Sequence, residues 1–183
     1  MSMKLTTTSK TILLGIAFQL VWLSLVATAN SSYYWFGPLV GIATYGFILF
    51  QLRSTEISIP LMSASFVGFS FDLMMDQMGI INLHSNQLTY SWLLILWLVF
   101  VGCFHQLFSW LSNFNSYTSF LFGSLGGVLS YYAASILGAV EIIRPNHFVL
   151  VYSFFWGISF LIASKVIIAR SLTANRRQTS ENY

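Results

Sequence analysis

The sequence predicts an all-α integral membrane protein, a compact bundle of about six transmembrane helices with both termini in the cytoplasm. Of its 183 residues, 56% are hydrophobic and only 7% are charged, whereas soluble domains are about 25% charged. Six apolar runs each approach the roughly 20 residues that a membrane helix needs. The positive residues lie mostly toward the chain ends, with Arg53 and Arg144 in loops, which indicates membrane topology rather than nucleic-acid binding.

Polar or turn-forming residues separate the six runs, which are 11–29, 33–52, 57–77, 90–111, 117–137 and 148–168. Because the connections are short, consecutive helices are expected to be antiparallel neighbours in one membrane domain, 1–170. A short polar cytoplasmic tail, 171–183, comes after it.

The first run also resembles a secretory signal peptide, with two preceding lysines and the small residues Ala27-Thr28-Ala29 at its end. Its apolar stretch is longer than the usual length of about 7–15 residues and contains Gln19 and Trp22. These features favour an uncleaved helix. Cleavage after residue 29, which would leave five spans, is the alternative.

Aromatic residues mark the expected outer ends of the second and fourth runs. Tyr33, Tyr34, Trp35 and Phe36 open the second run, and Tyr90 and Trp92 open the fourth. Tyrosine and tryptophan gather at membrane–water interfaces, so these residues are expected to anchor the helices rather than to bind a ligand.

The third run carries two aspartates, Asp72 and Asp76. Their spacing of four puts both on one helix face. Small and polar residues extend this face, which consists of Ser65, Gly68, Asp72, Asp76 and Gly79. The face should point into the bundle. The methionines and the phenylalanines Phe66, Phe69 and Phe71 should lie elsewhere. Asp72 is expected in the outer third of the helix, and Asp76 at the outer boundary where water solvates it.

Two interpretations of Asp72 stay open. An ionised acid at the bilayer centre costs about 2.5–3.5 kcal/mol, so Asp72 either hydrogen-bonds a neighbouring helix or is a functional ionisable group. In the second case Asp72 is a candidate catalytic acid or base.

The fourth run contains His105, the other candidate catalytic residue, which shares a face with Gly102 and Ser109. It lies roughly 22 Å from the outer end of the helix, too deep to pair directly with Asp72. A neutral histidine hydrogen-bonded between helices is the alternative. Cys103, the single cysteine, forms no intrachain disulfide and is not expected to be a nucleophile.

The fifth run has a helix-packing pattern of small residues. Gly126, Ser130, Ala134 and Gly138 recur every four residues, and Gly123 and Gly127 form an overlapping pair. This spacing allows close helix approach, which predicts the central helix of the bundle or a dimer seam. Gly37 and Gly41 of the second run are a candidate packing partner for this helix.

The loops predicted to be external gather several polar side chains into an outer-rim cluster of Asp76, His84, Glu141, Arg144 and His147. This cluster could be a set of ion pairs, a headgroup pocket or a metal site. No metal is predicted, because none of the spacings is a metal-ligand signature.

The positive residues set the orientation. With both termini inside, seven of the eight lysines and arginines are cytoplasmic and only Arg144 is external; the seven are Lys4, Lys10, Arg53, Lys165, Arg170, Arg176 and Arg177. This agrees with the positive-inside rule.

Residues 18–141 resemble the bacterial membrane family called domain of unknown function 2878. The resemblance rests on "FQLVW", "FDLMMDQMGI", "SWLLILWLVFVGCFHQLFSWL" and "GSLGGVLSYYAASILGAVEI". It is most specific at Asp72, Trp92, Trp97, His105, Trp110 and Leu111, and in the glycine pattern of the fifth run. Phe104 and Gln106 depart from an Asn-His-Ser arrangement, and Val128 replaces a proline. The resemblance implies a small multi-span inner-membrane protein, with a loose association to genes for membrane-lipid modification.

The expected function is that of a non-catalytic accessory or interaction subunit of the bacterial inner membrane, in envelope or lipid maintenance. A lipid-acting membrane enzyme with Asp72 as acid or base and a small-solute transporter or substrate-binding subunit are the alternatives. Membrane lipids, another membrane protein or a second copy of the chain are the expected partners, with no cofactor and no nucleic acid. An enzyme needs converging polar side chains, and a transporter needs an enclosed polar cavity near mid-membrane.

Overall fold

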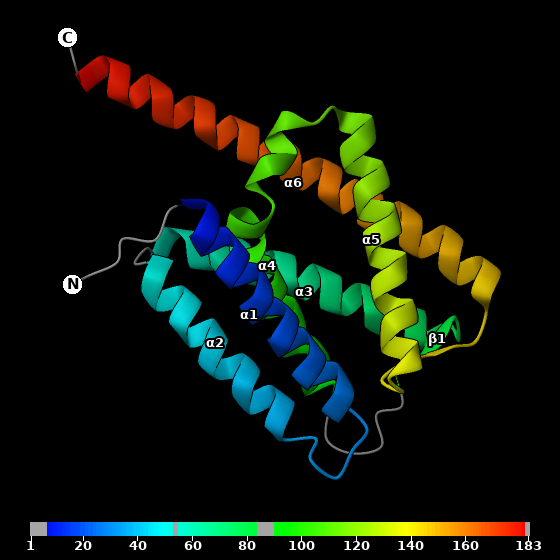
Figure 1. Ribbon diagram of the computed structural model, residues 1–183. Coiled ribbons are helices and arrows are strands. Elements are labelled where there is room, and N and C mark those ends of the chain that lie inside the picture. The colour runs from blue at the N-terminus through cyan, green and yellow to red at the C-terminus, as the bar shows by residue number, and fades with distance from the viewer. Residues whose placement is uncertain (1–6, 53–54, 84–89, 182–183) are drawn as a thin grey trace. The chain divides into compact units, whose positions relative to one another are not determined.

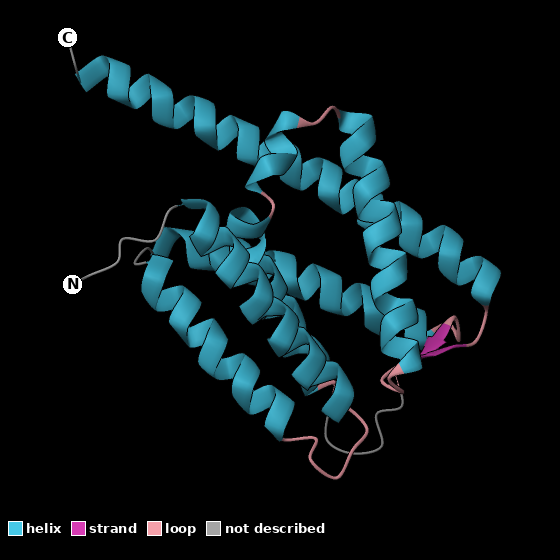
Figure 2. Ribbon diagram, in the orientation of Figure 1, coloured by secondary structure: helices cyan, strands magenta, loops and turns pink. Residues whose placement is uncertain are grey.

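The structure is a computed structural model that describes residues 7–52, 55–83 and 90–181, with side chains for 11–47, 62–83, 90–104, 107, 108, 110, 111 and 113–166. Six α-helices make up most of the described chain (Figure 1): α1 (Thr7–Thr28), α2 (Phe36–Leu52), α3 (Thr55–Gln77), α4 (Ser91–Leu107), α5 (Ser116–Ile136) and α6 (Pro145–Glu181). A 3₁₀ helix, η1 (Ser109–Asn113), follows α4. Two short strands, β1 (Ile81–Asn82) and β2 (Glu141–Ile142), complete the described elements (Figure 2).

The predicted all-α class is confirmed, and the six helices match the six apolar runs one to one. Two differences concern helix ends. The fourth run is divided, because α4 ends at Leu107 and η1 follows it. The sixth run is longer than predicted, because α6 begins at Pro145 and continues to Glu181. Proline suits the first turn of a helix, where its missing N–H has no intrahelical partner.

Three described helical segments are long and apolar enough to cross a membrane, namely Thr11–Thr28, Ser116–Ile136 and Pro145–Val166. Two shorter apolar segments are Phe36–Phe47 and Ser91–Phe104. These segments indicate a multi-pass membrane protein. The helix that carries both aspartates, α3, is in neither group, and its described part is rich in serine.

The chain divides into two compact units. The first unit comprises residues 1–107 and 132–145, and the second comprises 108–131 and 146–183. Within the first unit, α4 packs against α1, α2 and α3, and α1 also packs against α2. The helix in the middle of the first unit is therefore α4, whereas the small residues of the fifth run had suggested a central α5.

Hydrogen bonds connect three interhelical loops of the first unit. β1, after α3, pairs with β2, after α5, in antiparallel register, with Ile81 opposite Ile142. The backbone N–H groups of Ile143 and Arg144 donate to the carbonyl of Ile80. The side-chain amide of Asn30, in the loop between α1 and α2, donates to the carbonyl of Gly138. The α1–α2, α3–α4 and α5–α6 loops thus meet on one side of the first unit.

The ends of α3 and α5 explain two of the glycines. Gly79 and Gly138 have positive φ angles of 64° and 78°. After α3, Ile80 N donates to Met75 O and Gly79 N donates to Asp76 O, and the corresponding pair of bonds closes α5. This double bond pattern is the Schellman motif. Gly138 is therefore a helix cap beyond α5, not the last member of a packing stripe.

Small residues do allow close packing between α5 and α6 in the second unit. A Cβ atom on Gly123 would lie 2.5 Å from the carbonyl O of Trp156, and a Cβ on Gly127 would overlap the Trp156 ring. Ser124 Oγ donates to the carbonyl of Ser153 over 2.8 Å. Gly123 and Gly127, the overlapping pair of the predicted pattern, thus pack against α6.

The other predicted stripe does not lie on that seam. Gly126 is exposed with nothing within 4 Å of an added Cβ, Ser130 is half-buried and Ala134 is buried. The predicted packing partner of this stripe, Gly37 and Gly41 of α2, also packs against other helices. A Cβ on Gly37 would meet the α1 backbone, and a Cβ on Gly41 would overlap Ile95 of α4.

Candidate functional site

Asp72 is the strongest candidate for a functional residue, and it is fully buried, with 0% of its surface exposed. Its Oδ2 accepts a hydrogen bond from the indole Nε1–H of Trp97 on α4, over 2.7 Å. That distance lies in the range of charge-assisted hydrogen bonds, which are stronger than neutral ones. Asp72 therefore connects α3 to α4 inside the first unit.

The face of α3 around Asp72 is shaped to receive Trp97. One turn earlier, a Cβ on Gly68 would overlap the Trp97 ring. One further turn back, Ser65 Oγ donates to the Trp97 carbonyl O over 3.2 Å. The predicted inward face of Ser65, Gly68 and Asp72 is buried as expected, because a tryptophan occupies the space that the small residues leave.

Side chains on the rest of α3 agree with the prediction only in part. Phe66 and Met74 are 48% and 49% exposed, as expected for the opposite side of the helix. Met75 is 2% exposed, which contradicts the expectation that the methionines lie away from the bundle. It continues the buried face, because residue 75 succeeds Ser65, Gly68 and Asp72 at helical spacing.

Asp76 also makes two hydrogen bonds and is half-buried rather than fully solvated. Its Oδ1 accepts from the backbone N–H of Leu83 over 2.9 Å. Its Oδ2 accepts from Tyr90 Oη over 3.0 Å. The expectation of a purely water-solvated charge therefore needs correction. Asp76 fixes the end of α3 to the segment after β1 and to the residue that precedes α4.

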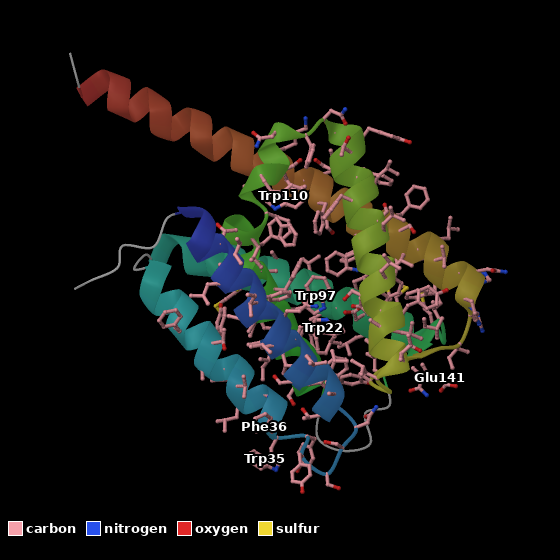
Figure 3. The ribbon with its side chains drawn as sticks, in the orientation of Figure 1. Trp22, Trp35, Phe36, Trp97, Trp110 and Glu141 are labelled. Carbon is pink, nitrogen blue, oxygen red and sulfur yellow. The ribbon has the colours of Figure 1, made fainter. Side chains whose placement is uncertain are left out.

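Three members of the predicted outer-rim cluster, Asp76, Glu141 and Arg144, lie in or next to the connected loops of the first unit. The β1–β2 ladder puts Glu141 opposite Asn82, and Arg144 donates its backbone N–H to Ile80 O while its side chain is exposed. Glu141 lies in the connection between α5 and α6 (Figure 3). His147 is exposed at the start of α6 in the second unit, and His84 lies outside the described residues. Among the described residues no three histidine, cysteine or acidic side chains are grouped as a metal site requires.

The second catalytic candidate, His105, belongs to α4 by its backbone, but its side chain lies outside the described ones. Its neighbour Cys103 is 0% exposed on the same helix.

The sequence analysis did not identify Trp97 and Tyr90 as the partners of the two acids. The sequence did contain a signal for the pairing of Asp72 with Trp97. α3 and α4 are antiparallel neighbours, and Asp72 lies five residues before the last residue of α3 while Trp97 lies six after the first of α4. Because these two distances from the shared connection differ by only one residue, the two side chains lie at similar depths along their helices. A buried indole N–H also needs an acceptor, and Asp72 is an acidic acceptor at that level.

Both carboxylates thus act as hydrogen-bond acceptors that hold α3 against later parts of the chain. In Asp72 the acceptor is enclosed by protein, and in Asp76 it lies at the end of the helix. Chemically, such an arrangement stabilises a helix pair without exposing the acid of Asp72 to solvent.

Comparison with known proteins identifies one family. The model of the family described as "Protein of unknown function (DUF2878)" matches residues 11–162. No curated protein and no solved structure matches the chain. The matched range contains Asp72, Trp97 and all of α2 to α5.

Proposed function

The chain belongs to the DUF2878 family of unknown function, and we propose that it is a multi-pass protein of the bacterial inner membrane that serves as a non-catalytic accessory or interaction subunit in envelope or lipid maintenance. Membrane lipids and another membrane protein, or a second copy of this chain, are its proposed partners. The candidate membrane spans support the membrane location.

One observation carries the non-catalytic interpretation: the 0% exposure of Asp72 combined with its 2.7 Å bond from Trp97. A general acid or base must reach a proton on its substrate directly or through one water. The carboxylate of Asp72 is instead enclosed between α3 and α4, where it accepts a bond that holds the two helices together. Hydrogen bonds of this kind between helices contribute to helix packing in membrane proteins.

Six spans with both termini in the cytoplasm form the second part of the proposal. The three loops joined by Asn30, β1 and β2 are the ones that this threading places outside. Alternate connections of an antiparallel bundle must lie on the same side of the membrane. The hydrogen bonds among these loops therefore support an even, alternating threading, and the distribution of positive residues supports its orientation.

A buried acid in a membrane helix also favours the enzyme and transporter alternatives, because such groups are often functional. Asp72→Asn separates these alternatives from the proposal. Asparagine keeps a side-chain oxygen that can accept from Trp97 but cannot be ionised. Asp72→Leu is the matched variant, similar in size but without an acceptor.

The experiment uses a strain that lacks the gene, complemented by each variant under detergent or chelator stress, with folded protein measured in parallel. We expect Asp72→Asn to fold and complement, and Asp72→Leu to lower the folded yield. If Asp72→Asn folds to wild-type yield but fails to complement, the carboxylate is functional. The proposal is then replaced by a lipid-acting enzyme with Asp72 as acid or base, or by a transporter.

A further inference from the structure

Helices α1, α2 and α4 of the first unit have short apolar lengths. Of the 22 residues of α1 the apolar part, Thr11–Thr28, has 18, and the whole helices α2 and α4 have 17 each. At 1.5 Å per residue these lengths are about 27, 25 and 25 Å. The hydrocarbon core of a typical bilayer is about 30 Å thick. By comparison, Ser116–Ile136 and Pro145–Val166 have 21 and 22 residues, or about 31 and 33 Å.

The outer end of α2 is marked by four consecutive exposed aromatic residues, which we name the aromatic collar: Tyr33, Tyr34, Trp35 and Phe36, with 67%, 45%, 54% and 46% of their surfaces exposed. Figure 3 shows Trp35 and Phe36 where the α1–α2 loop enters α2. Tyrosine and tryptophan prefer the headgroup level of the bilayer. The collar therefore fixes where the interface begins on this helix.

The collar is held by its own hydrogen bonds. Tyr34 N donates to Ser31 O, Phe36 N donates to Tyr33 O, and Tyr33 N donates to Ser31 Oγ over 3.1 Å. Asn30, just before this turn, is bonded to the carbonyl of Gly138. The collar is thus held by hydrogen bonds within its own turn, and Asn30 beside it connects this turn to the loop after α5.

α2 cannot slide along its neighbours to reach a thicker membrane. A Cβ on Gly37 would lie 2.8 Å from both Leu25 Cα and the Ser24 carbonyl O of α1. A Cβ on Gly41 would overlap Ile95 of α4. This close contact with the α1 backbone and with the Ile95 side chain of α4 fixes the register of α2 against both helices. On its other side, Leu39, Ile42 and Phe47 are 58–60% exposed, and the bilayer is the apolar medium available to cover them.

We propose that α1, α2 and α4, with the aromatic collar, form a lipid-binding surface that fits a bilayer thinner than average, and that the membrane beside α2 is locally thinned. The occupant of this surface is lipid acyl chain, with headgroups at the collar. The inference rests on the proposed membrane threading and extends it, because a short helix with a fixed register leaves the lipid to adapt. Local thinning is one of the ways a bilayer responds to a span that is too short.

The test reconstitutes the full chain in vesicles of dimyristoleoyl, dipalmitoleoyl, dioleoyl, dieicosenoyl or dierucoyl phosphatidylcholine and measures the thermal midpoint in each. We expect the highest midpoint in one of the two shortest lipids and a steady decrease toward the longest. The double variant Tyr34→Leu/Trp35→Leu lengthens the apolar part of α2 and should shift the optimum to a longer lipid. Ile42→Leu, a lipid-facing change on the same helix that leaves its length unchanged, should not shift it. An optimum in dioleoyl or a longer lipid overturns the inference, as does an optimum that the collar variant leaves in place.

Spin labels separate this failure from failure of the threading. Labels at Leu39→Cys and Phe47→Cys, in a Cys103→Ala background, should be relaxed by oxygen in the bilayer and shielded from a water-soluble agent. Exposure to the water-soluble agent in every lipid would show that α2 does not span, and the proposed threading would fail. Lipid-exposed labels with a long-chain optimum would overturn only the thinning. A label at Tyr33→Cys that is shielded from both agents would show a protein on the collar and would overturn lipid as its occupant.

Discussion

At the scale of single residues, two aspartates one helical turn apart have different surroundings. Asp72 is enclosed and accepts from an indole N–H of α4. Asp76 is half-buried and accepts from a backbone N–H and a phenol. Removing a donor from a buried carboxylate costs more than removing one from an acid near water, because water can replace the lost bond only in the second case.

The Trp97→Phe variant tests the enclosed bond. Phenylalanine keeps most of the ring but removes the N–H donor to Asp72, so the free energy of unfolding should fall by about 1–3 kcal/mol. The measurement is folded yield together with the thermal midpoint in detergent. Trp35→Phe makes the same chemical change at a 54% exposed position and should leave both unchanged. Equal losses in the two variants would contradict a stabilising role for the Asp72–Trp97 bond.

A double-mutant cycle tests Asp76. Tyr90→Phe removes only the phenol that donates to Oδ2, and Asp76→Asn replaces one acceptor oxygen by an amide. Each single change should lower the free energy of unfolding by about 0.5–1.5 kcal/mol, whereas from the sequence alone Asp76→Asn was expected to be nearly silent. Because the residues share one bond, the double variant should lose less than the sum. Strictly additive losses in unfolding experiments would show that the bond contributes nothing.

At the scale of elements, adjacent glycines on α5 have opposite environments. Gly127 lies against the ring of Trp156 on α6, and Gly126 has open space around it. Helical positions one residue apart are about 100° apart around the axis, so one can face α6 while the other faces outward. The space required by Trp156 and Phe160 therefore explains the pair Gly123 and Gly127, and leaves Gly126 without a packing role on this seam.

Alanine substitutions at these two glycines should have opposite signs. Gly127→Ala forces the Trp156 ring away from α5 and should lower the thermal midpoint and folded yield. Gly126→Ala meets no atom and replaces a flexible residue by a strong helix former, so it should stabilise the protein by about 0.5–1 kcal/mol. Destabilisation by Gly126→Ala would show that another surface packs on this side of α5.

At the scale of the whole molecule, the proposed threading accounts for which loops meet. The three loops joined by Asn30–Gly138 and by the β1–β2 pair are alternate connections of the chain. Such loops meet when successive helices cross in alternating directions. The loops are also poor in positive charge, with Arg144 as their single lysine or arginine, which agrees with an external location.

Reporter fusions test this threading. A reporter joined after Asn115 or after Tyr183 should be active as a cytoplasmic fusion, and one joined after Ser85 should be active as an external fusion. These outcomes are expected from placing seven of the eight positive residues inside. A mature N-terminus at residue 30, found by sequencing the purified protein, would instead support cleavage and five spans.

Hydrophobic length and composition let the sequence determine the number and type of the helices and most of their approximate ends, but not the end of α6. They do so because the apolar length of a segment is a local property, and this length decides whether the segment can span a bilayer. The family assignment and the inward face of α3 at Ser65, Gly68 and Asp72 were also accessible. The burial of Met75 was not, since an apolar methionine suits both lipid and protein and its composition does not decide between them.

Only the tertiary structure decided which helices and side chains meet. Small residues predict that something packs closely, but the spacing in α5 fits two stripes, and the bulk of Trp156 selects the one with Gly123 and Gly127. Likewise, a buried acid needs donors, but which donor reaches Asp72 depends on the rotation of α4, and which reach Asp76 depends on the path of the chain around β1. Contacts between distant residues depend on depth, rotation and register together, and the sequence specifies these only through the packed fold.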